Sequence, residues 1–167
     1  MKDTVLDGFT IRRSIRSYTG EPVNREKLAV ALKAAMAAPS ANNGKPWSFV
    51  VVTKRERIRA VCTAHPYAAF GANAGAVVIP FGTPTRPFFD QDMGAATENL
   101  LLALAQQGLG ATWCGLDDEL QSVIRPLIGL PADARAFAVI PVGVPAEKKE
   151  PRTQYEEARV HWERFSG

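Results

Sequence analysis

The chain has 167 residues, 46% of them hydrophobic, which is enough for one domain with a buried core and argues against disorder. The net charge is only +3, without a lysine run or basic helix, so we expect no nucleic-acid partner. Two cysteines without a CxxC spacing argue against a disulfide framework or zinc site. The polar N-terminus and the lack of any apolar run near ~18 residues predict no signal peptide, no membrane span and, by default, a cytoplasmic protein.

The first half of the chain mixes helical and strand patterns. Asn24 is typical of a helix N-cap, and Pro39 ends the helix that it starts. Residues 62–75 carry no readable pattern, so they either line a substrate pocket or simply cover a sheet. Apolar spacing and β-branched runs predict helices over 3–13, 24–37 and 54–62, and strands over 47–52 and 76–81.

The second half contains the most apolar helix, over 90–107. Its leucines occupy more than one stripe, which predicts a central helix that touches its own sheet and a partner chain. Gly108 closes this helix as a C-terminal glycine would, and Pro141 removes one backbone donor from the last strand, which predicts an edge position or a bulge. The remaining elements predicted are a strand over 111–114, a helix from Asp117 or Asp118 to about 127 and a strand over 136–144.

These elements predict one α+β domain over residues 1–167. The polar, charged tail over 145–167 carries scattered aromatic residues and cannot form a core of its own. We therefore expect the tail to dock either on its own chain or on a second copy.

Three arginines and a serine lie together in the stretch Arg12–Arg16. The arginine side chain presents a fixed fork of donors that fits a phosphate bidentately, and serine adds a small neutral donor. The stretch therefore suits an anion with several acceptor oxygens, although a solvated basic turn would have the same composition. Two further stretches, Pro39–Trp47 and Gly108–Gly115, favour a binding site.

In order and spacing these stretches resemble the nitroreductase family of FMN-dependent oxidoreductases. The resemblance implies a mixed, mostly antiparallel sheet flanked by helices, and an intertwined homodimer that binds flavin at its interface. Lys45 stands where the family often has Gln, and adds a charge near the expected flavin site. The matching residues are Arg12-Arg13-Ser14-Ile15-Arg16, Pro39-Ser40, Asn43, Pro46-Trp47, Gln91-Asp92, Ala95-Ala96, Asn99, Gly108-Leu109-Gly110, Trp113 and Gly115.

The resemblance also implies roles for the N-terminal arginines. Arg12 and Ser14 would hold the FMN phosphate and ribityl chain, and Arg13 would share that work. Arg16 would lie near N1 and O2 of the flavin, where a cation stabilises the negative charge of the reduced ring. Arg152, together with Lys149, would return from the tail to the phosphate.

Two other segments are implied as cofactor-binding. Cys114 and Gly115 would run beside the flavin N5, where glycine lets the backbone approach closely. Cys114 itself is interpreted as a small buried residue whose backbone matters more than its thiol. The flavin would be contacted from the other subunit by Pro39, Ser40, Ala41 and Asn43.

The implied activity is transfer of hydride from NADH or NADPH through FMN to a nitroaromatic, quinone or similar small-molecule acceptor. We assign no catalytic side chain and no metal, because the flavin carries the chemistry and the two histidines lie in no motif. The sequence has no GxGxxG signature, so the nicotinamide would stack on the flavin in the acceptor's pocket, which predicts ping-pong kinetics.

Other functions fit the same residues. The chain could be an FMN-binding protein that sequesters or senses flavin without fast turnover, or a family variant with dehalogenase or flavin-consuming activity. A third alternative is a basic module that binds anions through Arg12–Arg16. The sequence leaves open the physiological acceptor and the choice between NADH and NADPH.

Overall fold

A six-stranded sheet forms the centre of the protein in its computed structural model, which describes residues 4–85 and 87–165. Within the described residues every strand pairing is antiparallel and the one parallel contact is a bridge between Ser14 and Ala111, so the predicted mostly antiparallel α+β fold is confirmed. The main path runs through β1 (Ser48–Val52), β2 (Ala76–Gly82), β6 (Ala138–Gly143) and β3 (Gly110–Ala111), while β5 (Arg135–Ala136) pairs with β2 and β4 (Cys114–Gly115) with β6.

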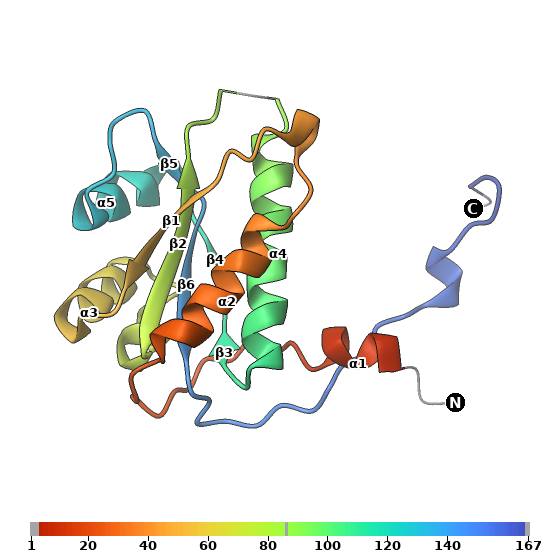
Figure 1. The fold of residues 1–167 in the computed structure, drawn as a ribbon, viewed down its shortest axis with the longest axis horizontal. Helices are drawn as coiled ribbons and strands as arrows, with labels where there is room; N and C mark the ends of the chain where they lie inside the picture. The colour runs from red at the N-terminus through yellow and green to blue at the C-terminus, as the bar shows by residue number, and fades with distance from the viewer. Residues whose placement is uncertain (1–3, 86, 166–167) are drawn as a thin grey trace.

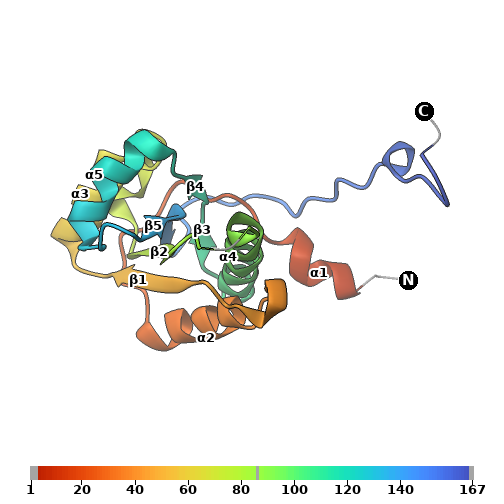
Figure 2. The same cartoon turned by 90° about the horizontal axis from the view of Figure 1, so that it is seen from above.

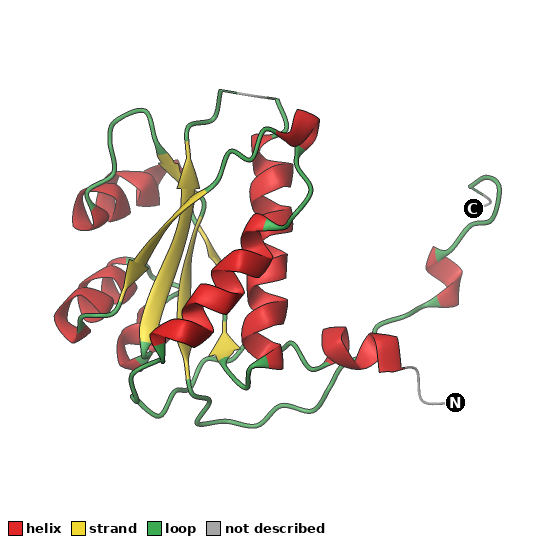
Figure 3. Ribbon diagram, in the orientation of Figure 1, coloured by secondary structure: helices red, strands yellow, loops and turns green. Residues whose placement is uncertain are grey.

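Helices cover both faces of this sheet (Figures 1 and 3). Helices α2 (Arg25–Met36) and α4 (Phe89–Gln106) lie on one face, and α3 (Arg55–Ala64) and α5 (Asp118–Ile128) on the other, as the view from above shows (Figure 2). The strands feed both layers because successive side chains point to opposite faces. Val78 and Ile140 pack with α2 and α4, whereas Val77 and Val139 pack with α3 and α5.

Local signals in the sequence set the limits of most helices correctly. The Asn24 side chain accepts hydrogen bonds from the backbone of residues 26 and 27, and so caps α2 as predicted. The Asp117 side chain caps α5 in the same way, and Gly108, with a φ of +75°, follows α4. Within the unreadable segment 62–75 the structure places the end of α3 and a 3₁₀ helix, η2 (Ala69–Asn73).

The strand predicted over 111–114 is instead two short strands in one register. Ala111 of β3 faces Val142, and Cys114 of β4, three residues later, faces Val139, three residues earlier. The interruption lies opposite Pro141, which has no backbone N–H to donate. The edge position predicted from Pro141 is wrong, because β6 lies between β2 and the β3–β4 strand.

Both ends of the chain leave the body of the protein on the same side (Figures 1 and 2). The predicted helix over 3–13 is shorter, α1 (Thr4–Thr10), with Leu6 and Phe9 about half exposed; residue 3 and the side chain of Val5 lie outside the described part. The tail contains a 3₁₀ helix, η3 (Glu157–Arg159), and every residue from 151 to 165 is exposed. Docking of the tail on the core of its own chain is therefore not observed.

Among the described residues, no helix combines the length and apolar character that crossing a membrane would require.

Candidate functional site

The segment of residues 12–16, here called the arginine segment, is fastened alongside β3. The Ile15 backbone N–H donates to the Ala111 carbonyl at 3.1 Å, and the Thr112 hydroxyl donates to the Ile15 carbonyl at 2.7 Å. The Ile15 side chain is buried against Gly110, where an added Cβ would lie 2.7 Å from Ile15 atoms. These contacts fix the backbone from which the three arginines project.

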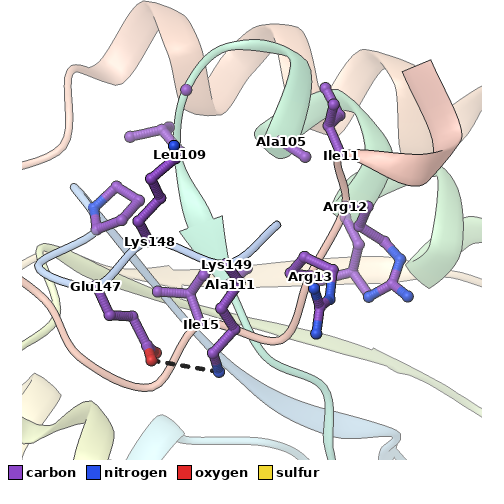
Figure 4. A pocket seen from close by; sticks show the side chains of 13 residues that line it. Ile11, Arg12, Arg13, Ile15, Ala105, Leu109, Ala111, Glu147, Lys148 and Lys149 are labelled. Atoms are coloured by element: carbon purple, nitrogen blue, oxygen red, sulfur yellow. Dashed lines mark ion pairs between the residues drawn. The ribbon is translucent and has the colours of Figure 1, made fainter. Parts of the chain in front are cut away.

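Arg12 and Arg13 line a surface pocket between α4, the start of β3 and the first residues of the tail, here called the Arg12 pocket (Figure 4). Arg12 forms an ion pair of 3.2 Å with Glu98 on α4, while Arg13 donates to the Glu150 carbonyl of the tail. The pocket encloses about 200 Å³, and Lys148 and Lys149 also line it. Among its charged residues the cations outnumber the single carboxylate, Glu147, as an anion site requires.

Glu147 and Lys149 tie the beginning of the tail to the arginine segment. Glu147 accepts hydrogen bonds from the backbone N–H groups of Arg16 and Ser17 and pairs with Lys149 at 3.3 Å (Figure 4). The bond from the Arg16 backbone is the main reason that the pKa of Glu147 lies below its usual value. Lys149 also donates to the Ser14 carbonyl at 2.6 Å, so its ammonium group already has two partners.

A second pocket begins at Arg16 and is here called the Arg16 pocket. Its walls come from the arginine segment, the segment between α3 and η2, and β4, and its volume is about 400 Å³. The Arg16 guanidinium lies 5.9 Å from the centre of the Phe70 ring. The lining residues are Arg16, Pro66, Tyr67, Phe70, Thr112, Trp113, Cys114 and Gly115. A cation, aromatic rings and exposed backbone therefore meet in one place.

Gly115 faces open space in this pocket. A Cβ added there would meet no heavy atom within 4 Å, and its φ is not in the left-handed region that favours glycine. Nothing in the chain itself therefore requires glycine at this position. The space beside the backbone fits a flat ligand that approaches closely.

The neighbouring thiols are shielded from reaction. Cys114 is buried and lies 3.3 Å from the Tyr67 carbonyl, to which it donates. Burial raises the pKa of Cys114 to about 11 and that of Cys62 to about 12, so both are protonated at neutral pH. This agrees with the interpretation of Cys114 as a buried residue.

The segment of residues 39–45, here called the asparagine loop, lies at the N-terminal end of α4 and contains the 3₁₀ helix η1 (Ala41–Asn43). Asn42, Asn43 and Lys45 have φ values of 51°, 54° and 46°, which is unusual for residues other than glycine. The buried carboxylate of Asp92 accepts from the Ala41 backbone at 2.9 Å, and the Ser40 hydroxyl accepts from the Lys45 backbone at 3.0 Å.

Within one chain the predicted site residues thus fall into separate groups. Asp92, which holds the asparagine loop, precedes Leu101 of the Arg12 pocket by nine residues, roughly 14 Å along α4. Arg152 joins neither pocket; its backbone donates to Thr10 at 3.0 Å, and it lines a hollow against α1. The residues that the structure brings together are Arg12, Arg13 and Lys149 in one pocket, Arg16, Cys114 and Gly115 in the other, and Ser14 between them.

Three polar residues near these groups received no role from the sequence. Glu147 and His65 contact the arginine segment and β4 through backbone groups, so no motif marks them. Asp92 belongs to a motif that we matched, but its contact with the asparagine loop depends on the fold. Among the described residues, no three His, Cys, Asp or Glu side chains are grouped to hold a metal ion.

Comparison with known proteins gives a consistent result. The model of the Nitroreductase family matches residues 10–68 and 62–144. A protein of Methanothermobacter thermautotrophicus named "Putative NADH dehydrogenase/NAD(P)H nitroreductase" is 37% identical over 171 residues, covering 98% of this chain and 89% of the relative.

Solved structures share the fold over nearly the whole chain. A crystal structure with the same name from Bacteroides thetaiotaomicron has a TM-score of 0.92 and 33% identity, covering 99% of this chain and 100% of the other. An FMN-dependent nitroreductase from Clostridium difficile has a TM-score of 0.87 and 27% identity, covering 95% of this chain and 99% of the other.

Proposed function

The chain belongs to the nitroreductase family, and we propose that it is an FMN-dependent oxidoreductase that passes hydride from NAD(P)H to a nitroaromatic, quinone or similar acceptor. The observation that carries this proposal is the Arg16 pocket, which is lined by both the cation of Arg16 and the bare backbone of Gly115. When bound, FMN supplies the hydride-accepting chemistry that no side chain here can provide.

Arg16 and β4 fit the ring end of such a cofactor. The Arg16 backbone is anchored by Glu147, and its guanidinium lies 5.9 Å from the centre of the Phe70 ring, which places its charge at the pocket. A preorganised cation stabilises developing negative charge without reorganisation. Gly115 leaves room for backbone contact with a planar ring, and the aromatic side chains of Tyr67, Phe70 and Trp113 offer flat faces against which such a ring can pack.

The Arg12 pocket fits the phosphate end. Arg12 and Arg13 offer forks of N–H donors, and Lys148 adds a further charge. In the structure Arg12 pairs with Glu98, so a phosphate would compete with that carboxylate. Ser14 lies in the same segment between the two pockets, where it would bind the chain linking phosphate and ring. The Lys149 ammonium acts indirectly, because it is engaged with Ser14 and Glu147.

We propose a homodimer in which the asparagine loop of one subunit completes the flavin site of the other. This explains why Pro39, Ser40, Ala41 and Asn43 lie away from both pockets of their own chain. The outer stripe of α4 supports an interface, since it carries no charge except the paired Glu98. Its residues are Gln91, Ala95, Glu98, Leu102 and Ala105.

The two chain ends support the same assembly. Leu6 and Phe9 of α1 are 49% and 56% exposed, and Trp162 and Phe165 of the tail are 81% and 79% exposed. Apolar groups displayed on segments that leave the body are typical of surfaces that a second copy covers. Most such assemblies have two-fold symmetry.

Donor and acceptor would use the same pocket in turn, because each must reach the flavin ring on the side where Arg16 and Gly115 line the Arg16 pocket. This predicts ping-pong kinetics, with parallel double-reciprocal plots when the acceptor concentration is varied.

The test starts from protein purified without added flavin. A flavin absorbance spectrum, tighter binding of FMN than of riboflavin and steady NAD(P)H consumption with a nitro compound or quinone are expected. Binding without turnover would favour a flavin carrier, and turnover only with halogenated aromatics would favour a dehalogenase. Protein that binds neither FMN nor riboflavin would refute the proposal.

A further inference from the structure

His65 is completely buried and uses both ring nitrogens beside the Arg16 pocket. Its Nδ1 atom accepts a hydrogen bond from the Tyr67 backbone N–H at 3.1 Å. Its Nε2 atom lies 2.8 Å from the Gly115 carbonyl oxygen. Because an amide N–H only donates and a carbonyl only accepts, the imidazole is neutral with its proton on Nε2. His65 therefore donates a hydrogen bond to the Gly115 carbonyl of β4. The Tyr67 N–H, in the turn that follows α3, holds the imidazole ring in place.

A second contact joins the same two segments. The Cys114 thiol donates to the Tyr67 carbonyl at 3.3 Å, and its raised pKa keeps the proton on sulfur. Both residues of β4 are thus contacted, Cys114 through its thiol and Gly115 through its carbonyl oxygen. Both contacts come from residues 65–67, the turn that follows α3.

Strand β4 packs into the core through Cys114, but its backbone ladder is short. It contains only Cys114 and Gly115, it pairs with β6 at Val139 and Ala138, and it is separated from β3 by the interruption opposite Pro141. A strand with so short a ladder is held weakly by backbone pairing alone. The hydrogen bond from His65 restrains the Gly115 carbonyl from the side, in addition to the pairing of Gly115 with Ala138.

We propose that His65 is a positioning residue that holds the β4 backbone at the wall of the Arg16 pocket, and so sets how the Gly115 backbone meets the flavin ring. This inference rests on the proposed function. It gives a role to a residue of segment 62–75, for which the sequence showed no readable pattern. A displacement of about 1 Å in a reacting geometry can lower a rate by roughly 100-fold, so a restraint of this kind has a measurable effect.

The competing explanation is that His65 only fills the core between α3 and β4. Two substitutions separate the explanations, because an asparagine amide reaches the position of Nδ1 and a glutamine amide reaches that of Nε2. His65→Gln keeps a donor for the Gly115 carbonyl, whereas His65→Asn keeps only the partner of the Tyr67 N–H. His65→Leu keeps apolar volume and removes both bonds.

The first measurement is hydrogen exchange of residues 112–116 in full-length protein as purified, read by mass spectrometry. We expect His65→Gln to exchange as wild type does, and His65→Asn and His65→Leu to exchange roughly tenfold faster. This readout does not depend on catalysis, so it stands apart from the proposed function.

The second measurement is anaerobic stopped-flow reduction of FMN-saturated protein by NAD(P)H. We expect His65→Gln to stay within about threefold of wild type, and His65→Asn to be slower by roughly 10- to 100-fold with FMN affinity retained. Equal rates for the Gln and Asn variants, or faster exchange without slower reduction, would overturn the positioning role. Wild-type protein that binds FMN but is not reduced would refute the proposed function and, with it, this role.

Discussion

The Oε1 atom of Glu147 lies 2.5 Å from the backbone nitrogen of Arg16 and 3.1 Å from that of Ser17. One carboxylate in the tail therefore holds the backbone of the segment that carries the predicted flavin ligands. The same side chain pairs with Lys149, which in turn donates to the Ser14 carbonyl. The beginning of the tail is thus part of the site, although the rest of the tail leaves the body.

This contact predicts a specific loss of stability in acid. The pKa of Glu147 is lowered in the folded protein, chiefly by the bond from the Arg16 backbone, so folding favours the ionised form. Such a group stabilises the fold above its unfolded pKa, near 4.5, and the stabilisation disappears as the pH falls through the folded value. Thermal unfolding between pH 7 and pH 3 should show a weaker acid dependence for Glu147→Gln than for wild type.

Glu150 provides the matched control for that experiment. Its side chain is 78% exposed and pairs with the similarly exposed Lys148, so Glu150→Gln should unfold with the pH dependence of wild type. Identical pH profiles for wild type and Glu147→Gln would contradict the role given to Glu147.

A pair of glycines tests whether the space beside β4 belongs to a ligand. Gly115→Ala places its methyl group in open space and should change the free energy of unfolding by less than about 0.5 kcal/mol. Gly110→Ala places the methyl group 2.7 Å from Ile15 and should destabilise the protein by about 1–3 kcal/mol. Binding of FMN, measured by fluorescence quenching, should weaken for Gly115→Ala. Unchanged FMN affinity in that variant would show that the flavin ring does not lie on this side of β4.

The buried carboxylate of Asp92 should maintain the asparagine loop. Asp92→Ala leaves the Ala41 N–H without its partner, which costs about 1–3 kcal/mol, whereas Asp92→Asn keeps an acceptor oxygen. Urea unfolding should therefore rank wild type and the Asn variant above the Ala variant. Lys33→Ala, at an exposed position of α2 outside the proposed interface, serves as the control and should be neutral. An Ala variant as stable as wild type would mean that the asparagine loop does not depend on the hydrogen bond to Asp92.

The two thiols should resist alkylation in the native state. Thiolate is the reactive form, and pKa values of about 11 and 12 leave about one part in a thousand or less ionised at pH 8. Iodoacetamide at pH 8 should modify Cys62 and Cys114 slowly in native protein and fast in denaturant, as mass spectrometry would show. Rapid native modification of Cys114 would indicate that β4 opens in solution.

The sequence predicted elements whose signals are local. Asn24 and Gly108 mark helix ends through their own hydrogen bonds and φ values, and the runs over 47–52 and 76–81 became β1 and β2. The arginine stretch was also visible, because its chemistry lies in adjacent residues. Such local signals do not identify the residue that lies opposite on a neighbouring strand. The division of β3 from β4 follows from Pro141, a residue on the strand opposite.

The site residues that the sequence did not reveal were missed for the same reason. His65 and Glu147 act on backbone groups 50 and 131 residues away, and a backbone acceptor or donor leaves no trace in residue type. The left-handed conformation of Asn42, Asn43 and Lys45 was not visible in the sequence, because the glycine of this loop, Gly44, lies between them and has a φ of −70°. Asparagine tolerates this region, but the lysine there depends on the bond to Ser40.

The exposed tail gives a last prediction, about assembly. Removing residues 153–167 keeps the Arg152 backbone bond to Thr10, and every deleted residue that the structure describes (153–165) is exposed, so the body should keep its fold and its far-ultraviolet circular dichroism spectrum. In the proposed dimer the tail covers the second copy, and the truncated protein should dissociate at concentrations where full-length protein stays dimeric. Light scattering over a dilution series measures this, with subunits of 18.1 kDa as the reference mass for the full chain.

The triple substitution Tyr155→Ser, Trp162→Ser and Phe165→Ser separates chain length from apolar contact, because it keeps the backbone and removes the large exposed side chains. It should weaken the dimer as the truncation does, while Arg164→Ser, at an exposed polar position of the same tail, should not. If the truncated protein and wild type have the same mass at every concentration, the tail has no part in the interface and α4 alone must hold the subunits together. If wild type is a monomer that still binds FMN, both the dimer and the completion of the site by the asparagine loop are wrong.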